Sequence, residues 1–225
     1  MITIVDYHKG NLMSVERGLA AQGAAVRVTD DAAVIARASA VVLPGVGAFG
    51  DAAATMVRLG QMEAVREAVS RGAAFLGICL GMHLMFEAGE EGAPDGGPNP
   101  QGLGLIPGVV RRLPRQGADG ASFKVPHVGW NSVVPPVPPE PDLRDFPLMP
   151  SPLLDGIAPG EYFYFTHSYV APDGPATIGL TTHSVTFPSA VAASGRAFGV
   201  QFHPEKSSDA GAQLLRNFVT LAEEA

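Results

Sequence analysis

The sequence has a single cysteine in 225 residues. One cysteine excludes an internal disulfide and a cysteine-rich zinc site, so Cys79 is either a packed small hydrophobe or a reactive thiol. The chain also has no run of lysine or arginine, and its formal net charge is -7. This acidic balance argues against nucleic acid or an anionic membrane as the main partner.

Long hydrophobic segments are missing as well. The longest apolar stretches, such as residues 73–80, are too short to span a bilayer, and residues 1–15 lack the basic region and apolar core of a signal peptide. We therefore expect a cytoplasmic protein that does not bind membranes. The chain has no G-x-x-x-x-G-K-[ST] phosphate loop and no convincing dinucleotide fingerprint, so we expect neither a cofactor nor a metal.

The sequence does contain an alternation of apolar, β-branched runs with helical patterns. Strands are predicted at residues 2–5, 25–28, 40–43 and 73–78, with helices near 12–22, 31–38 and 52–70. Buried strands joined by helical crossovers predict an α/β fold with three layers, in which helices cover both faces of a mostly parallel central sheet. We expect residues 1–225 to form a single domain.

The second half is predicted to add strands and hairpins to the same core. These strands are expected at 106–112, 161–170, 176–183, 190–194 and 197–202, with a last helix from Ser207 onward. Residues 133–154 are dense in proline and predict a surface loop. Residues 89–102 predict a second loop.

Cys79 lies in the stretch GICLGMH, between Gly77 and Gly81. A G-x-C-x-G pattern between an apolar strand and a helical pattern is typical of a nucleophile elbow, in which a strained turn exposes the nucleophile. The following helix would direct N–H groups at the sulfur and favour the thiolate. Glycines around a buried cysteine also occur in tightly packed strand ends, so the pattern alone does not decide.

A candidate base lies in GVQFHPEKS, residues 199–207. His203 follows a predicted strand, and Glu205 lies two positions further on, across a proline, where it can accept the imidazole N–H. The carboxyl ends of parallel strands are the usual side for such sites. The alternative is an edge loop with a solvated His-Pro-Glu sequence.

Together these motifs resemble a known family. GICLGMH, LPGVGAFGD at 43–51 and GVQFHPE occur in the order typical of triad-type, class I glutamine amidotransferases, and the resemblance covers nearly the whole chain. DYHKGNLMSV at the N-terminus, VPHVGWN at 125–131 and YFYFTHSY at 162–169 are similar to one branch, the glutaminase subunits of imidazole glycerol phosphate synthase. The resemblance implies a flavodoxin-like, three-layer fold.

The resemblance also implies roles for individual residues. Cys79 would attack the carboxamide of glutamine, His203 would protonate the departing ammonia, and Glu205 would fix the imidazole. Leu80 and the 44–47 segment would supply backbone N–H groups to the oxyanion. The substrate-binding residues implied are Gly45, Gly47, Leu80, His83, Glu91, Ser168 and Tyr169.

The chain has no spare length for a domain that consumes ammonia, so it should work with a partner. The resemblance implies a heterodimer with a (βα)8-barrel cyclase subunit, to which ammonia passes through the interface. That subunit would combine ammonia with a phosphoribulosyl-formimino aminoimidazole carboxamide nucleotide. Candidate interface residues are Asn11, Trp130, Tyr164 and Lys206, with a core position as the alternative for Trp130.

One residue departs from the family pattern, which usually has glutamine where this chain has His83. An imidazole is shorter than the amide and has one donor and one acceptor when neutral. We expect His83 to keep a weaker substrate contact and to add pH dependence to KM; the alternative is that it only packs.

Two other functions remain possible. The chain could be a glutaminase for another synthase or a γ-glutamyl hydrolase, against which VPHVGWN and YFYFTHSY argue. It could also be a non-enzymatic regulatory or structural relative, against which the presence of Cys79, His203 and Glu205 argues.

Overall fold

The central element is a seven-stranded sheet with the strand order β10-β11-β12-β4-β3-β1-β2. The computed structural model describes residues 1–136 and 151–224. Five strands are parallel to one another, and β10 and β11 add an antiparallel edge. In chain order the strands are β1 (Ile2–Val5), β2 (Val26–Thr29), β3 (Ala40–Gly45), β4 (Ala74–Cys79), β10 (Thr177–Thr182), β11 (Thr186–Ser194) and β12 (Ala197–Val200). The predicted α/β class with a mostly parallel sheet is confirmed.

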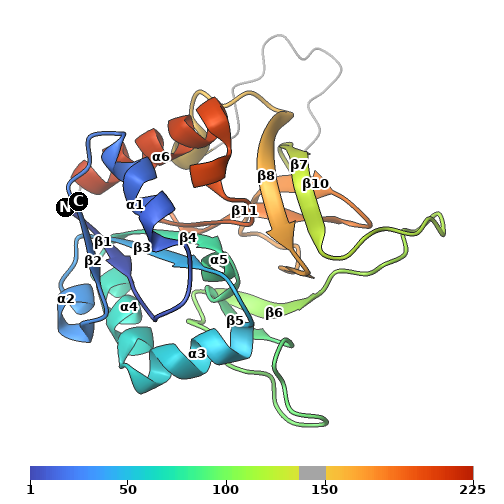
Figure 1. Cartoon of the computed structure of the whole chain (residues 1–225), viewed down its shortest axis with the longest axis horizontal. Helices are drawn as coiled ribbons and strands as arrows, with labels where there is room; N and C mark the ends of the chain where they lie inside the picture. Colours follow the sequence, from blue (N-terminus) through green and yellow to red (C-terminus); the bar gives the residue numbers. More distant parts are fainter. Residues whose placement is uncertain (137–150, 225) are drawn as a thin grey trace.

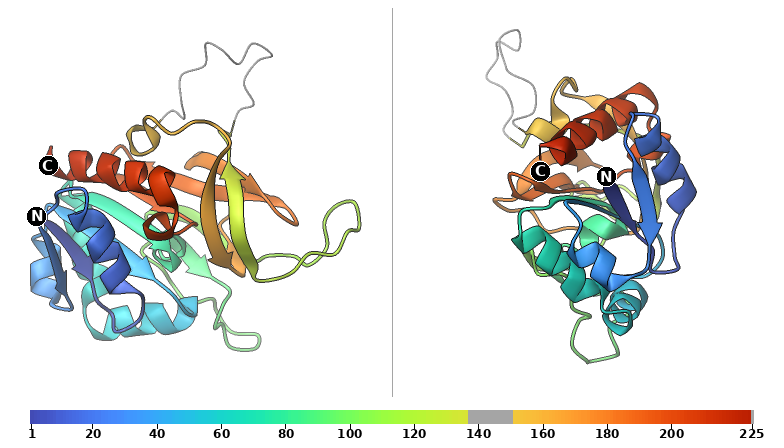
Figure 2. Two further views of the ribbon diagram at one scale, coloured as in Figure 1. Left: turned by 45° about the horizontal axis from the view of Figure 1, so that its top comes forward. Right: turned by 90° about the vertical axis from the view of Figure 1, so that its left-hand side faces the viewer.

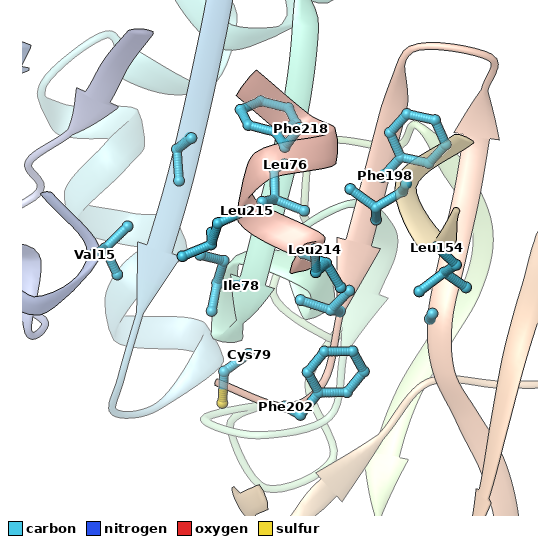
Figure 3. Close-up of a cluster of buried hydrophobic side chains, with 14 of the residues drawn as sticks. Val15, Leu76, Ile78, Cys79, Leu154, Phe198, Phe202, Leu214, Leu215 and Phe218 are labelled. Carbon is cyan, nitrogen blue, oxygen red and sulfur yellow. The ribbon is translucent and has the colours of Figure 1, made fainter. Parts of the chain in front are cut away.

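Helices cover both faces of this sheet (Figure 1, Figure 2). One face packs against α1 (Leu12–Ala20) and α6 (Ser208–Glu223), and the other against α2 (Ala32–Ala36), α3 (Phe49–Arg58) and α4 (Gln61–Ser70). Figure 3 shows the α6 side: Phe218 lies near Leu76, Leu214 and Leu215 lie near Ile78, and Cys79 lies at the end of β4. The core of the protein therefore extends to the carboxyl end of β4.

The predicted helix over 52–70 is wrong in one respect, because the segment forms two helices. α3 begins earlier, at Phe49, and ends at Arg58; α4 begins after Gly60, which has a φ of 70°. This left-handed backbone conformation favours glycine and interrupts the helical hydrogen bonding.

Two smaller sheets accompany the central one. β7 (His127–Val133) pairs with β8 (Glu161–His167), and β6 (Ile106–Arg112) lies between β5 (Phe86–Gly89) and β9 (Tyr169–Val170). The strand predicted over 161–170 is therefore two strands, interrupted at Ser168. β5 and β7 were not among the predicted strands.

Both ends of the proline-rich segment, predicted as a surface loop over 133–154, belong to regular structure. Residues 137–150 lie outside the described residues. Val133 closes β7, and the 3-10 helix η2 (Pro152–Leu154) buries Leu153 and Leu154 in the core. Asn217 of α6 donates a hydrogen bond to the carbonyl of Leu153 at 3.0 Å, which ties this end of the segment to the helix.

A short helix, α5 (Leu80–His83), follows β4, and a 3-10 turn, η3 (Pro204–Lys206), follows β12. Within the described part of the chain, no helix combines the length and apolar character that a membrane crossing requires.

Candidate active site

Cys79 lies at the carboxyl end of β4 in a strained conformation, with φ 54° and ψ -107°. Such a backbone is rare for a residue with a side chain and is typical of functional turns. The flanking glycines are required by close approach: a Cβ on Gly77 would lie 2.5 Å from the carbonyl oxygen of Gly81, and one on Gly81 would lie 1.7 Å from that of Leu43. The elbow expected from the sequence is therefore present.

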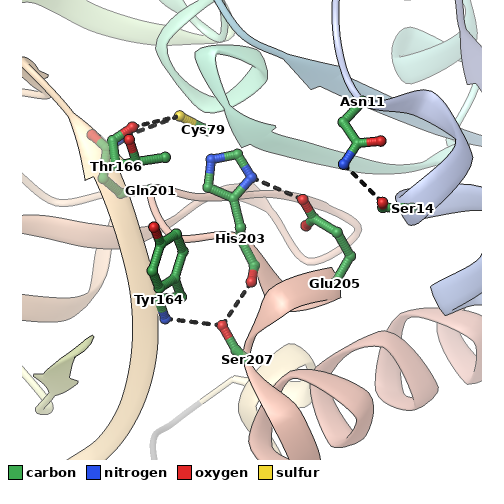
Figure 4. Close-up of polar contacts among 9 residues, drawn as sticks. All are labelled: Asn11, Ser14, Cys79, Tyr164, Thr166, Gln201, His203, Glu205 and Ser207. Atoms are coloured by element: carbon green, nitrogen blue, oxygen red, sulfur yellow. Dashed lines mark hydrogen bonds and ion pairs between the residues drawn. The ribbon is translucent and has the colours of Figure 1, made fainter. Parts of the chain in front are cut away.

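His203 reaches the same edge of the sheet because β12 is the neighbour of β4. Val200 pairs with Ile78, so the residues that follow each strand emerge side by side. His203 Nδ1 lies 2.9 Å from Glu205 Oε1, and the two side chains are only 5% and 2% exposed. Figure 4 shows the imidazole between Glu205 and Cys79. The His203 backbone is fixed by its N–H, which donates to Tyr164 O, and its carbonyl, which accepts from Ser207 Oγ.

The charges at the site favour a protonated His203. Burial lowers the pKa of His203, but hydrogen-bonding and charge interactions with Cys79 and Glu205 outweigh it and raise the pKa to about 9. Nε2 makes no hydrogen bond of good geometry within the described residues. The sulfur is nevertheless close enough to influence its charge, and such contacts are often long before substrate binds. The site therefore places a protonated imidazole between the carboxylate of Glu205 and the sulfur of Cys79.

A pocket of about 270 Å³ opens beside the sulfur of Cys79. Six of the seven residues predicted to bind substrate line it: Gly47, Leu80, His83, Glu91, Ser168 and Tyr169. Gly45 does not. It is buried at the end of β3, where an added Cβ would lie 2.1 Å from Tyr7 Oη. Val46, Pro126, Thr166 and His167 also line the pocket, and all four belong to motifs that carried the resemblance.

Glu91 is linked to the segment that carries the expected oxyanion donors. Its Oε2 accepts the backbone N–H of Phe49 at 2.9 Å, and its carbonyl accepts that of Gly50 at 3.0 Å. Partial burial raises the pKa of Glu91, and the N–H of Phe49 opposes that rise. Glu91 thus holds the start of α3, directly after residues 44–48.

His83 is buried, and its Nε2 lies 2.6 Å from Gln201 Oε1. Burial lowers the pKa of His83 to about 4, and the contact with Gln201 only partly opposes this. With so low a pKa, His83 does not change charge near neutral pH. The structure therefore argues against the pH dependence of KM that we expected from this residue. Sequence reasoning also missed Gln201, whose Nε2 lies 3.8 Å from Cys79 Sγ.

Two further histidines form a buried chain behind the pocket. His167 Nδ1 donates to Tyr169 O at 2.9 Å, so His167 Nε2 must accept from His127 Nδ1, also at 2.9 Å. Asn131 Nδ2 completes the chain by donating to His127 Nε2 at 3.3 Å. Burial lowers the pKa of His127 to about 4 and of His167 to about 3. These neutral imidazoles hold the pocket strand between Thr166 and Tyr169.

Three of the four candidate interface residues form one patch. The rings of Trp130 and Tyr164 meet edge to face at 6.2 Å, and Lys206 Nζ lies 5.9 Å from the Tyr164 ring centre. Trp130 is 51% exposed, which excludes the core position considered for it. Asn11 is exposed before α1, and its side chain donates to Ser14 Oγ. Among the described residues, no three His, Cys, Asp or Glu side chains are grouped to hold a metal ion.

This geometry can perform acyl transfer from an amide. A thiolate attacks the acyl carbon, and the adjacent imidazolium protonates the departing nitrogen. Cysteine-dependent amide hydrolases form the class that the fold and the site define together.

The glutamine amidotransferase class-I family model matches residues 3–222, so the chain belongs to that family. Within it, the chain is 44% identical to the imidazole glycerol phosphate synthase subunit HisH of Moorella thermoacetica, over 100% of this chain and 96% of that relative. It is 45% identical to the subunit of the same name from Symbiobacterium thermophilum, over 96% of this chain and 92% of that relative. The resemblance seen in the motifs is confirmed.

A solved structure titled "Crystal structure of glutamine amidotransferase" matches with a TM-score of 0.66 and 18% identity, over 99% of this chain and 98% of that one. At this identity the match supports the fold alone, and it agrees with the class I architecture.

Proposed function

We propose that the chain is the glutaminase subunit of an imidazole glycerol phosphate synthase and hydrolyses glutamine to glutamate and ammonia. Full-length identity of 44% to a HisH subunit carries the assignment of the synthase. The 2.9 Å contact between His203 and Glu205, beside the strained Cys79, supports the chemistry.

In the first half of the reaction, the thiolate of Cys79 attacks the carboxamide carbon of glutamine and forms a C–S bond. The electron pair of the carbonyl moves to oxygen, and backbone N–H groups of Leu80 and of the 44–47 segment stabilise this oxyanion. His203 donates its proton to the nitrogen, the C–N bond breaks, and ammonia leaves a γ-glutamyl thioester.

Water completes the cycle. His203, now neutral, removes a proton from water as it attacks the thioester, and collapse of the second tetrahedral intermediate releases glutamate and restores the thiolate. Glu205 keeps the imidazole in the orientation that presents Nε2 to the sulfur. The polar groups of Glu91, Ser168 and Tyr169 would fix the amino-acid end of glutamine in the pocket.

The ammonia would pass to a (βα)8-barrel cyclase subunit. The patch of Trp130, Tyr164 and Lys206 lies next to His203 in the chain of contacts, because Tyr164 O accepts the His203 N–H. Docking of a partner on this patch would place its channel close to the leaving ammonia. Binding of nucleotide to the partner would then affect His203 through Tyr164. We also propose that the protein acts in the cytoplasm, as expected from the sequence.

The test is glutamate release from glutamine by the purified chain, alone and with the cyclase subunit from the same organism plus its nucleotide substrate. We expect release near background alone and an increase of orders of magnitude in the loaded complex, with none for Cys79→Ala. A silent complex, or equal release from the free chain and the complex, would contradict the assignment of this partner.

A further inference from the structure

The fully buried amide of Gln201 contacts the reactive sulfur from the neighbouring strand and is not part of the pocket lining. Gln201 follows β12 directly, beside the end of β4, and is 0% exposed. Its Nε2 lies 3.8 Å from Cys79 Sγ, and its Oε1 lies 2.6 Å from His83 Nε2. The amide therefore links His83, the last residue of α5, to Cys79, the N-cap of that helix.

A backbone carbonyl contacts the sulfur as well, and it favours the opposite protonation state to the one that the Gln201 N–H favours. The carbonyl oxygen of Thr166 lies 3.8 Å from Cys79 Sγ (Figure 4). A thiol can donate its proton to that oxygen, whereas a thiolate is repelled by it. The sulfur thus lies between a carbonyl that favours the thiol and an amide N–H that favours the thiolate.

The direction of the Gln201 amide decides which preference prevails. If the amide were reversed, its carbonyl would join that of Thr166 against the thiolate. An N–H donor opposite Oε1 prevents the reversal, and His83 supplies it when its proton is on Nε2. Because His83 is buried, it stays neutral near neutral pH, and its single proton lies on one of the two ring nitrogens.

We propose that Gln201 stabilises the thiolate of Cys79 through its amide N–H, and that His83 is a positioning residue that fixes the direction of this amide. The inference rests on Cys79 being the nucleophile of the proposed function. It also gives His83, which stands where the family usually has glutamine, a role near the thiol that is separate from any contact with substrate.

The titratable groups that face the sulfur come from several elements. They are His203, the N-cap of η3, supported by Glu205, and Tyr7 after β1; His83, at the end of α5, reaches the sulfur through Gln201. Burial, followed by the Cys79 charge, raises the pKa of Tyr7, so its hydroxyl stays neutral. Replacing Gln201 or His83 leaves His203, Glu205 and Tyr7 in place.

The experiment is the rate of alkylation of Cys79 by iodoacetamide between about pH 5 and pH 9, without glutamine or partner. Gln201→Met keeps the length of the side chain and removes the donor. We expect alkylation near neutral pH to slow about tenfold and the profile to move to higher pH, since a hydrogen bond to a charged group is lost. Gln61→Met, at another buried glutamine that donates to the carbonyls of Asp6 and Asp30, is the matched control and should alkylate like the wild type.

His83 tests the positioning step. His83→Leu should slow alkylation to a similar degree, His83→Gln should restore it by supplying another N–H, and His83→Leu combined with Gln201→Met should be no slower than Gln201→Met alone. If His83→Leu changes only KM for glutamine and leaves alkylation unchanged, the positioning role is wrong. If Gln201→Met, folded by its thermal transition, alkylates like the wild type, the proposal as a whole is wrong.

A second variant covers the case in which Gln201→Met does not fold. Gln201→Glu keeps the shape and directs a carboxylate at the sulfur, so alkylation should fall by more than tenfold; an unchanged rate overturns the proposal. Because alkylation needs neither glutamine nor a cyclase, failure of this inference is separate from failure of the proposed function, which glutamate release alone decides.

Discussion

At the scale of the residue, the site depends on three ionisable side chains held close together with little solvent. The side chains of His203 and Glu205 are almost fully buried, and Cys79 is 7% exposed. In such surroundings each charge is stable only because the next one compensates it. The His203 ring lies between Glu205 and Cys79, so loss of either neighbour changes both the proton affinity and the orientation of the ring.

Glu205→Gln tests this dependence. The amide keeps the shape of the side chain but removes the carboxylate that steadies the imidazolium, so kcat for glutamine hydrolysis in the complex should fall about 10²–10⁴-fold with KM nearly unchanged. Glu63→Gln is the matched control, because Glu63 is exposed on α4, where it pairs with Arg66. Steady-state glutamate release measures both constants, and a kcat within threefold of wild type would remove Glu205 from the mechanism.

Single residues also mark the limit of what could be predicted from the sequence. Cys79, His203 and Glu205 were predicted because short, ordered motifs carry them. Gln201 lies inside one of those motifs, but a glutamine at a strand end has no pattern that indicates a buried contact with sulfur. The pairing of His127 with His167 joins segments 40 residues apart, and only the register of β7 and β8 brings them together.

At the scale of the element, parallel strands explain why the predicted site residues meet. Gly45 pairs with Cys79 across β3 and β4, and β12 brings His203 to the same edge. Apolar runs predicted these strands well because they are buried on both faces. β7 was missed because its exposed and buried positions include polar residues, and its partner is a distant strand rather than a hairpin neighbour.

The contact between β3 and Tyr7 yields a prediction for the oxyanion segment. A Cβ on Gly45 would lie 2.1 Å from Tyr7 Oη and 3.0 Å from Leu80 Cβ, so Gly45→Ala should displace the chain beside both expected oxyanion donors. We expect a loss of about 1–3 kcal/mol in the free energy of unfolding and a lower kcat, measured by denaturant unfolding and glutamate release.

Tyr7→Phe in the Gly45→Ala background should recover part of both losses, because it removes the atom in closest conflict. Tyr7→Phe alone should not destabilise the protein by more than about 0.5 kcal/mol, since Oη has no hydrogen-bond partner of good geometry among the described residues. Gly174→Ala is the control, because a Cβ added at Gly174 would have no described atom within 4 Å outside its chain neighbours. If Gly45→Ala is as harmless as Gly174→Ala, the close contact does not constrain the segment.

At the scale of the whole molecule, the buried histidines link the stability of the fold to pH. Burial holds the pKa of His83 and His127 at about 4 and that of His167 at about 3, below the ordinary value of 6.5. His203 has the opposite shift, to about 9, because Cys79 and Glu205 outweigh its burial. The two kinds of histidine therefore act on opposite sides of neutral pH.

The sign of each effect follows from proton binding. Between about pH 4 and pH 6.5 the unfolded chain binds protons at His83, His127 and His167 that the folded chain does not, so stability should fall as the pH falls through this window, by up to about 1.4 kcal/mol per pH unit for each histidine. The stability contributed by His203 is complete below its unfolded pKa and should be lost as the pH rises from about 6.5 to about 9.

Urea unfolding at a series of pH values should therefore give a maximum near neutral pH, with a steep acid side. His83→Gln should flatten that side, because the amide can still pair with Gln201 but takes up no proton; at pH 7 it should unfold close to the wild type. His8→Gln, at a surface position, is the matched control and should leave the acid side unchanged. An acid side equally steep in His83→Gln and wild type would mean that His83 is charged in the folded protein, and its pairing with the amide beside Cys79 would then have to be reconsidered.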